Sequence, residues 1–230
     1  MFLVAVARPR FDSEGNKIFS GKIGVFPLVR QEPTKRNSIN RRAGSLVTKP
    51  IASITKEVSR QFLIEHVVPA IKEKWPRDSI GEPIYIQQDN ARCYIDPDDN
   101  EFCRVATEDG FNIRLMNQPP NSPDLNILDL GFFNGIQSLQ YKEAPKTVDD
   151  LIAAMVKSFE SFLAVKSNKI FLTLKCCMVE IMKVRGSNKY DLPHMRKEVM
   201  EKEGPLPNQI KCDPKLVQEV MEYLSCGNIG

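Results

Sequence analysis

The sequence predicts an α/β fold in which a mixed sheet is followed by a helical C-terminal part. Short β-branched runs dominate the first half of the chain, and longer stretches with helical apolar spacing fill the second half. The 230 residues suffice for one large domain, or for one domain with an extension. The hydrophobic content of 42% is that of a globular protein and excludes a disordered chain.

A β-hairpin is expected at the start of the chain. The runs 2–11 and 21–29 are apolar and β-branched, and the turn-forming segment DSEGNK lies between them. Residues 30–50 are polar and basic and show no apolar period. They are therefore expected to form a loop.

A helix and two strands complete the first half. Apolar side chains recur at helical spacing from residue 54 to 74, with a kink or a restart expected at Pro69 and an end at Trp75-Pro76. The runs 83–88 and 111–118 are then expected as strands.

The second half is predicted to be helical. Pro123 is suited to the first position of a helix, and Thr147, followed three residues later by Asp150, resembles a capping box. The expected helices are 125–141, a helix beginning at 147, 168–184, 193–203 and 214–224. We therefore expect a sheet-containing core over 1–165 and a helical extension over 166–230.

The composition indicates an intracellular protein without a membrane segment. No apolar run approaches the roughly 18 residues that span a bilayer. The opening MFLVAVARPRF alternates and contains two arginines and a proline, so it predicts a strand and not a signal peptide. The six cysteines contain no CxxC pair, which favours reduced thiols over a zinc site.

The net charge of +3 is unevenly distributed. Residues 30–49 hold one acid, Glu32, and six bases, which are Arg30, Lys35, Arg36, Arg41, Arg42 and Lys49. Residues 89–109 hold seven acids and two arginines. Either segment alone is most simply a solvated loop. Together they fit a protein that contacts a polyanion and also holds cations.

Two aspartates occupy unusual positions. Asp89 directly follows the apolar strand 83–88, where an aspartate is usually a turn cap, a salt-bridge partner or a metal ligand, because burying an unpaired carboxylate is costly. Asp129 lies between leucines in an apolar helical pattern, on the same face as Asn126. If the two carboxylates converge, they offer the oxygen ligands that Mg²⁺ prefers in phosphoryl transfer. A solvated Asp129 is the alternative.

Four blocks resemble the plant-type mariner-like transposases over nearly the whole chain: FLVAVARPRF (2–11), QQDNA (87–91), NQPPNSPDLNILDLGFF (117–133) and KVRGSNKYDLPHM (183–195). In that family QQDNA holds the second of three catalytic acids and SPDLNxLD the third, with thirty-nine residues between them. Thirty-nine residues also separate Asp89 from Asp129. The resemblance implies a truncated RNase H-like (retroviral-integrase-type) mixed sheet with flanking helices and a helical C-terminal extension.

The same resemblance implies a function, namely the metal-dependent DNA cleavage and strand transfer of intact relatives. Asp89 and Asp129 would be catalytic and would hold Mg²⁺ or Mn²⁺, and Asn90 and Asn126 would orient them or contact DNA. Asp124 would have a structural role in the loop. The six bases of residues 30–49 would bind DNA backbones. The implied partners are DNA and a second copy of the chain, and the implied location is the nucleus.

The chain also departs from the family pattern. The strand that ends in the family's first acid precedes the FLVAVARPRF block, at which this chain begins, and Asp12 is expected to open a turn and not to replace that acid. Without that strand, 2–11 and 83–88 are expected either to pair directly or to leave a groove between them. Cys93-Tyr94 stands where the family has a histidine. A non-catalytic, transposase-derived DNA-binding or interaction protein is therefore the alternative function.

Overall fold

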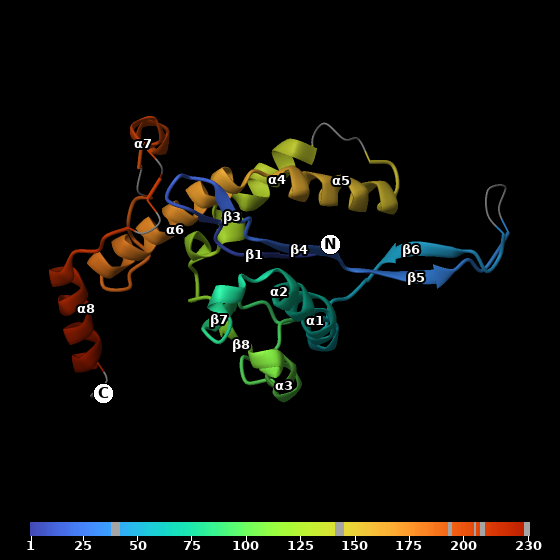
Figure 1. Ribbon diagram of the computed structural model, residues 1–230. Coiled ribbons are helices and arrows are strands. Elements are labelled where there is room, and N and C mark those ends of the chain that lie inside the picture. The colour runs from blue at the N-terminus through green and yellow to red at the C-terminus, as the bar shows by residue number, and fades with distance from the viewer. Residues whose placement is uncertain (38–41, 141–144, 193–194, 205, 208–209, 228–230) are drawn as a thin grey trace. The chain divides into compact units, whose positions relative to one another are not determined.

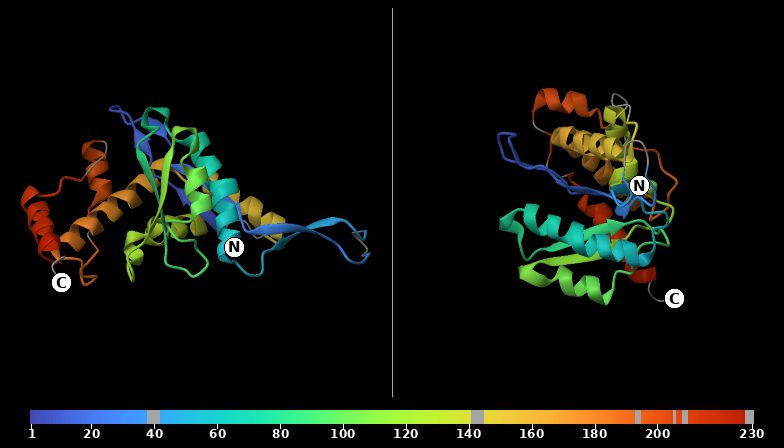
Figure 2. Two further views of the ribbon diagram at one scale, coloured as in Figure 1. Left: turned by 90° about the horizontal axis from the view of Figure 1, so that it is seen from below. Right: turned by 90° about the vertical axis from the view of Figure 1, so that its right-hand side faces the viewer.

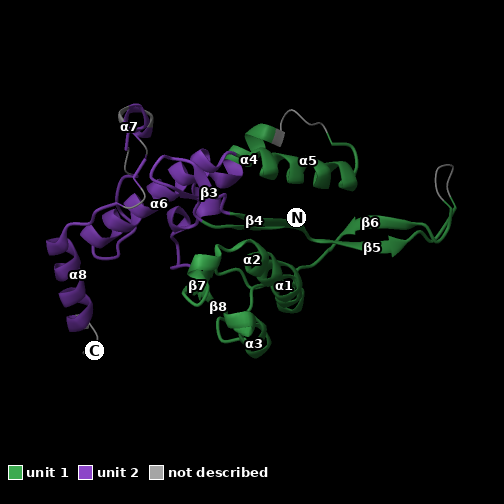
Figure 3. Cartoon of the chain, in the orientation of Figure 1, with its two compact units in different colours: residues 1–7, 22–117, 135–162 green, residues 8–21, 118–134, 163–230 purple. Residues whose placement is uncertain are grey.

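The computed structural model describes residues 1–37, 42–140, 145–192, 195–204, 206–207 and 210–227 (Figure 1, with two further views in Figure 2). The chain forms two compact units, each assembled from separated stretches of sequence (Figure 3). Unit 1 comprises 1–7, 22–117 and 135–162, and unit 2 comprises 8–21, 118–134 and 163–230. The division expected at residue 165 stays a prediction.

Unit 1 contains strands and helices, as the predicted α/β class requires. Its described strands are β1 (Phe2–Val6), β4 (Lys22–Pro27), β5 (Val29–Pro33), β6 (Leu46–Pro50), β7 (Pro83–Gln88) and β8 (Asn112–Asn117). Its helices are α1 (Lys56–Phe62), α2 (Val68–Lys74), α3 (Asn100–Ala106) and α5 (Val148–Ser161). Helix α4 (Phe133–Gln140) begins in unit 2 and continues into unit 1. The α/β class is confirmed.

The strands of unit 1 pair two by two. β1 and β4 are antiparallel, as are β5 and β6, whereas β7 and β8 run parallel. β1 and β7 belong to different two-stranded sheets, so within the described chain each is hydrogen bonded along one edge only. Direct pairing of these two strands, one of the two outcomes expected from the sequence, is thereby excluded for the described residues.

Helices α1 and α2 join near Pro69, where the sequence predicted a kink or a restart, and the backbone stays helical through the joint (Phe62 ψ −37°, Val68 ψ −48°). A π-helical turn, Leu63–Val67, joins them immediately before that proline. Proline has no N–H to donate to the carbonyl four residues before it. The turn before Pro69 is widened, and Val68 N donates to the backbone oxygen of Leu63, five residues before it. Trp75 is extended (ψ 137°) before Pro76 and ends α2 as expected.

The core of unit 1 is apolar and joins helices to strands. α3 lies against β8, and α5 lies against β4. The side chains at most 5% exposed include Ile23, Val67, Val68, Ile71, Ile84, Phe102, Ala106, Ile113, Ile136 and Phe159. Helix α5 begins with the predicted capping box, in which Thr147 Oγ1 accepts from Asp150 N at 3.1 Å and Thr147 N donates to Asp150 Oδ2 at 3.0 Å.

The expectation of a loop over 30–50 is wrong, because β5 and β6 form a two-stranded ribbon there. None of the ten residues in these strands is buried. A strand without a buried face has no apolar alternation, so its sequence carries no period-2 signal. The ribbon is held by its backbone ladder and by a hydrogen bond from Gln31 Nε2 to Thr48 Oγ1 at 3.0 Å.

Unit 2 is mainly helical. Its described elements are β2 (Arg10–Phe11), β3 (Lys17–Phe19), α6 (Ala164–Lys183), α7 (Lys197–Glu203) and α8 (Pro214–Gly227), a 3-10 turn at Pro123–Leu125 and a π-helical turn at Leu128–Phe132. β2 and β3 form an antiparallel hairpin around the DSEGNK turn. Across the parts of the chain that are described, no helix is long and apolar enough to cross a membrane.

Asp99 connects two elements of unit 1. Its Oδ1 accepts from Phe102 N at 3.1 Å and so caps α3, while its Oδ2 accepts from Arg60 Nη2 at 2.8 Å and Nε at 3.0 Å. The hydrogen bonds from Arg60 hold the pKa of the Asp99 carboxyl below its usual range. A depressed folded-state pKa contributes stability that is present above the unfolded pKa, about 3.9, and is lost as pH falls through the folded pKa.

We expect Asp99→Asn to reduce stability in a pH-dependent way. Asparagine keeps the cap of α3 but removes the carboxylate, so the variant loses the Arg60 ion pair alone. Its Tm should lie below that of the wild type at neutral pH, and the difference should shrink in strong acid, where the wild-type carboxylate is also protonated. Thermal unfolding followed by circular dichroism from neutral pH down to strong acid measures this. A difference in Tm that is independent of pH would contradict the assignment.

Candidate functional site

The carboxyl ends of β7 and β8 form a polar edge in unit 1. Ile84 and Ile113 are buried partners within the two strands, and the last partners are Gln88 and Asn117. Gln88 Nε2 donates to Asn117 Oδ1 at 3.0 Å and to the backbone oxygen of Ile95 at 2.7 Å. Ligands of α/β proteins bind beyond the carboxyl ends of parallel strands, so this edge is the natural place for a site.

Asp89 follows β7 directly at this edge. It is exposed, and the strand before it is not fully buried, because β7 alternates, with Ile84 buried and Tyr85 57% exposed. Asp89 Oδ1 accepts from Ala91 N at 2.7 Å, which confirms the turn-cap alternative for this oxygen. Asn90, the next residue, is exposed as well. Asp89 is therefore open to solvent and already fixed by its own turn.

Asp129 lies in unit 2, on the π-helical turn Leu128–Phe132, and is also exposed. Asn126 orients it: Nδ2 donates to Asp129 Oδ2 at 2.9 Å, and Oδ1 accepts from Leu128 N at 3.0 Å. The two residues share a face, as their spacing predicted. Gly131 within this turn has non-helical backbone angles (φ 171°, ψ −13°), so Asp129 lies beside a kink at which two helical pieces meet.

The acidic stretch 89–109 is largely used for structure within unit 1. Asp96 pairs with Lys56 at 3.0 Å, Asp99 with Arg60 at 2.8 Å and Asp109 with Lys72 at 2.8 Å. These bases all belong to α1 and α2. The local excess of acid in the sequence is thus matched by the two neighbouring helices, and it does not by itself indicate a cation site.

Within the described residues of either unit, neither Asp89 nor Asp129 belongs to a complete set of metal ligands. Among the residues that the structure describes, no group of three or more His, Cys, Asp or Glu side chains is arranged to hold a metal. Asp89 belongs to unit 1 and Asp129 to unit 2, and each unit is described by itself. The convergence of the two carboxylates on one ion therefore stays a prediction.

The predicted DNA-binding bases lie on the β5–β6 ribbon and its tip. Arg30 and Lys49 both pair with Glu32, at 2.5 and 2.8 Å. Their proximity lowers the pKa of Glu32, and the hydrogen bond from Lys49 is the largest cause. The tip bases Lys35, Arg36 and Arg42 are exposed, and Arg41 lies outside the described residues.

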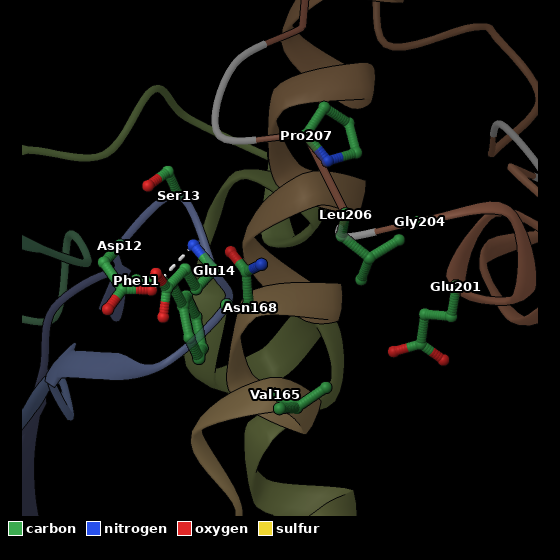
Figure 4. Close-up of a pocket in the computed structure, with 11 residues that line it drawn as sticks. Phe11, Asp12, Ser13, Glu14, Val165, Asn168, Glu201, Gly204, Leu206 and Pro207 are labelled. Atoms are coloured by element: carbon green, nitrogen blue, oxygen red, sulfur yellow. Dashed lines mark hydrogen bonds between the residues drawn. The ribbon is translucent and has the colours of Figure 1, made fainter.

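Unit 2 contains a pocket of about 610 Å³ between the β2–β3 turn, the start of α6 and the residues Glu201, Gly204, Leu206 and Pro207 (Figure 4). Its acids are bonded within the unit. Asp12 Oδ1 accepts from Asn16 N at 2.7 Å and from Glu14 N at 3.0 Å, and Glu201 pairs with Lys169 at 2.5 Å. Asp12 thus opens a turn, as predicted from the sequence. The carboxylates of Asp12 and Glu201 bond to neighbouring residues of unit 2.

Sequence reasoning missed Gln88 and Asn117, whose pairing closes the edge beside Asp89. A signal was present, because each of the two strands ends in consecutive polar residues, Gln87-Gln88 and Asn117-Gln118. Polar residues that replace the apolar run at the ends of two parallel strands mark the edge at which a site is built.

Known proteins give no independent guide to this edge. No protein family model matches the chain, and neither a curated protein nor a solved structure matches it.

Proposed function

We propose that the chain is part of a mariner-like cut-and-paste DNA transposase, with Asp89 and Asp129 as the carboxylates of a phosphodiester-cleaving site. The observation that carries the proposal is the position of these two acids. Each is exposed on a sharp local turn, and they are separated by the thirty-nine residues typical of the resembled family. The proposal includes DNA as partner, Mg²⁺ or Mn²⁺ as cofactor, a homodimer and a nuclear location.

The arrangement of strands in unit 1 supports an RNase H-like core. In the sheet implied by the resemblance, an antiparallel pair and a parallel pair flank one central strand. β1–β4 is antiparallel, β7–β8 is parallel, and the helices α1 and α2 lie between them in sequence. The edges of β1 and β7 that lack a partner in the described chain are the edges that such a strand would occupy.

The residues around the two acids support distinct roles. Asn126 would hold Asp129 in one orientation, because its amide bonds both the carboxylate and the backbone of the turn. Asp89 would present Oδ2 to a ligand while Oδ1 caps its own turn. A divalent ion held there would stabilise negative charge on a phosphodiester. Because neither acid belongs to a complete set of metal ligands within the described residues of its unit, a further ligand would have to come from elsewhere.

Iron-directed cleavage of the polypeptide tests whether the two acids share a metal ion. Fe²⁺ replaces Mg²⁺ in the 230-residue protein, and ascorbate with peroxide then produces radicals that cut the backbone near the bound iron. We expect cuts close to Asp89 and close to Asp129, both suppressed by excess Mg²⁺. Asp89→Asn and Asp129→Asn should each remove both sets of cuts, because each carboxylate contributes to the same ion.

Asp124→Asn is the matched control, since Asp124 lies five positions from Asp129 and carries the same charge. It should leave both sets of cuts unchanged. Cuts near only one acid, or variants that each abolish only their own cuts, would show separate sites and would end the proposal of a shared metal.

The second candidate is a non-catalytic, transposase-derived DNA-binding protein. The basic tip of the β5–β6 ribbon favours it, because this tip lies within one unit and needs no metal. Absence of iron-directed cuts together with retained duplex binding would select this function over the first.

A further inference from the structure

The β5–β6 ribbon is a two-stranded arm in which no residue is buried, and helix α5 contacts its strand β6. Its five register pairs run from Val29 opposite Pro50 to Pro33 opposite Leu46, and Figure 1 shows the two strands side by side, leading away from β4. Ile51 N donates to the backbone oxygen of Leu28 at 3.0 Å, which closes the base of the arm. At about 3.4 Å per residue, five pairs span about 17 Å.

The described part of the tip is held in place by hydrogen bonds. Thr34 N donates to the backbone oxygen of Ser45 at 2.8 Å, and Thr34 Oγ1 donates to that of Arg42 at 2.7 Å. Asn37 Oδ1 accepts from Ala43 N at 2.7 Å. The basic side chains of Lys35, Arg36 and Arg42 therefore project from an ordered backbone. This lowers the conformational entropy that is lost when they bind a ligand.

Positive charge increases from the base of the arm to its tip. Arg30 and Lys49 both pair with Glu32, so these three residues near the start of the arm carry a net charge near +1. Residues 33–48 contain no acid. Lys35, Arg36 and Arg42 are exposed, and the structure gives them no ion-pair partner among the residues it describes. The end of the arm thus suits a polyanion, whereas its base is nearly neutral.

The two faces of the arm differ in chemistry. Partners in the ladder project from the same face, so Arg30 and Lys49 lie on one face with Glu32 between them. The other face carries Gln31 and Thr48, which are hydrogen bonded to each other, and then Leu46, which is 68% exposed. Amide and hydroxyl groups bond to base edges, and apolar side chains contact the thymine methyl group.

We propose that the β5–β6 ribbon enters the major groove of duplex DNA. The side chains of Lys35, Arg36 and Arg42 would contact phosphates, and the face that carries Gln31 and Thr48 would lie toward the edges of the nucleobases. The proposal rests on the proposed function, which supplies DNA as the partner. The major groove of B-form DNA, about 12 Å wide and 8.5 Å deep, admits a two-stranded ribbon, and the arm is longer than the groove is deep. The narrow major groove of A-form RNA excludes it.

Salt-dependent binding of the 230-residue protein to a short labelled DNA duplex tests the role of the tip. The variant Lys35→Ala/Arg36→Ala/Arg42→Ala should bind more weakly, and its slope of log affinity against log salt should fall by about three, because each phosphate contact contributes about 0.9. The control Lys166→Ala/Lys211→Ala/Lys215→Ala removes the same charge from exposed positions of unit 2 and should keep the wild-type slope.

Modified duplexes test the groove with the wild-type protein. Glucosylated 5-hydroxymethylcytosines fill the major groove, and we expect them to weaken binding at least about tenfold, while netropsin, which occupies the minor groove, should change it little. Gln31→Ala/Thr48→Ala should keep the salt slope but reduce the difference in affinity between duplexes of different sequence, because it removes groups that face the bases.

The outcomes separate the two proposals. No binding to any duplex at low salt would overturn both the DNA function and the ribbon proposal. Three other outcomes would overturn the ribbon proposal alone. They are duplex binding with an unchanged salt slope in the tip variant, equal binding of the glucosylated and unmodified duplexes, and equal binding of duplex RNA and duplex DNA. The tip variant could also lose self-association in light scattering and keep its DNA affinity. That result would identify the arm as a contact between two copies of the chain and would overturn the ribbon proposal.

Discussion

Replacing Phe102 with alanine should lower the free energy of unfolding by about 3–5 kcal/mol, the usual loss for a fully buried phenylalanine. The side chain is 0% exposed, and its helix, α3, lies against β8. Its backbone N–H is also the group that Asp99 caps, so the ring enters the core from a fixed helix end. Because a domain is stable by only about 5–15 kcal/mol, this single change is expected to remove a large part of that stability.

Urea unfolding followed by far-ultraviolet circular dichroism measures this loss. Leu46→Ala is the matched control, since it also truncates a large apolar side chain but at a position that is 68% exposed. It should change stability by less than about 0.5 kcal/mol. A loss below about 1 kcal/mol for Phe102→Ala would mean that α3 is not part of the cooperative core of unit 1.

Gly135→Val should destabilise the protein by about 2–3 kcal/mol through overpacking. Gly135 lies in α4, and a Cβ atom there would come within 2.5 Å of Phe162 Cε2. Phe162 is only 4% exposed, so its ring has little room to move aside. The glycine thus permits close approach of α4 to the end of α5, both within unit 1 at these residues.

A double-mutant cycle isolates this contact from the helix propensity of valine. Gln137→Val introduces the same side chain at an exposed position of α4 and should cost only a few tenths of a kcal/mol. Adding Phe162→Leu to Gly135→Val should recover part of the lost stability, because the smaller side chain leaves space for the new methyl groups. Additive effects of the two substitutions would contradict the predicted steric contact.

Elements that bury one face could be predicted from the sequence, and exposed or short elements could not. The helix over 54–74, the strands at 83–88 and 111–118 and the capping box at Thr147 all appear close to their expected positions. The β5–β6 ribbon was missed because no residue in it is buried. Helix α3 was missed because seven residues hold too few apolar positions to establish a helical period.

The candidate site was predictable in its residues but not in its geometry. The end of β7 and the apolar pattern around Asp129 located the two acids, and the spacing of Asn126 and Asp129 correctly placed them on one face. Two features depend on side-chain contacts that no periodicity in the sequence encodes. Asp89 caps its own turn, and Glu32 pairs with two of the six basic residues expected to bind DNA. The same holds for the matching of the acids at 96–109 by α1 and α2.

The open edge of β1 has a consequence for the fate of partly unfolded molecules. Phe2–Val6 is five consecutive apolar residues with high β propensity, and in the described chain it is paired along one edge only. Such a segment is a template for amyloid-like stacking of identical chains. Arg8, Pro9 and Arg10 follow almost immediately, and two charges and a proline act as gatekeepers that interrupt a growing cross-β stack. The length of the aggregation-prone segment is thereby limited to the first residues of the chain.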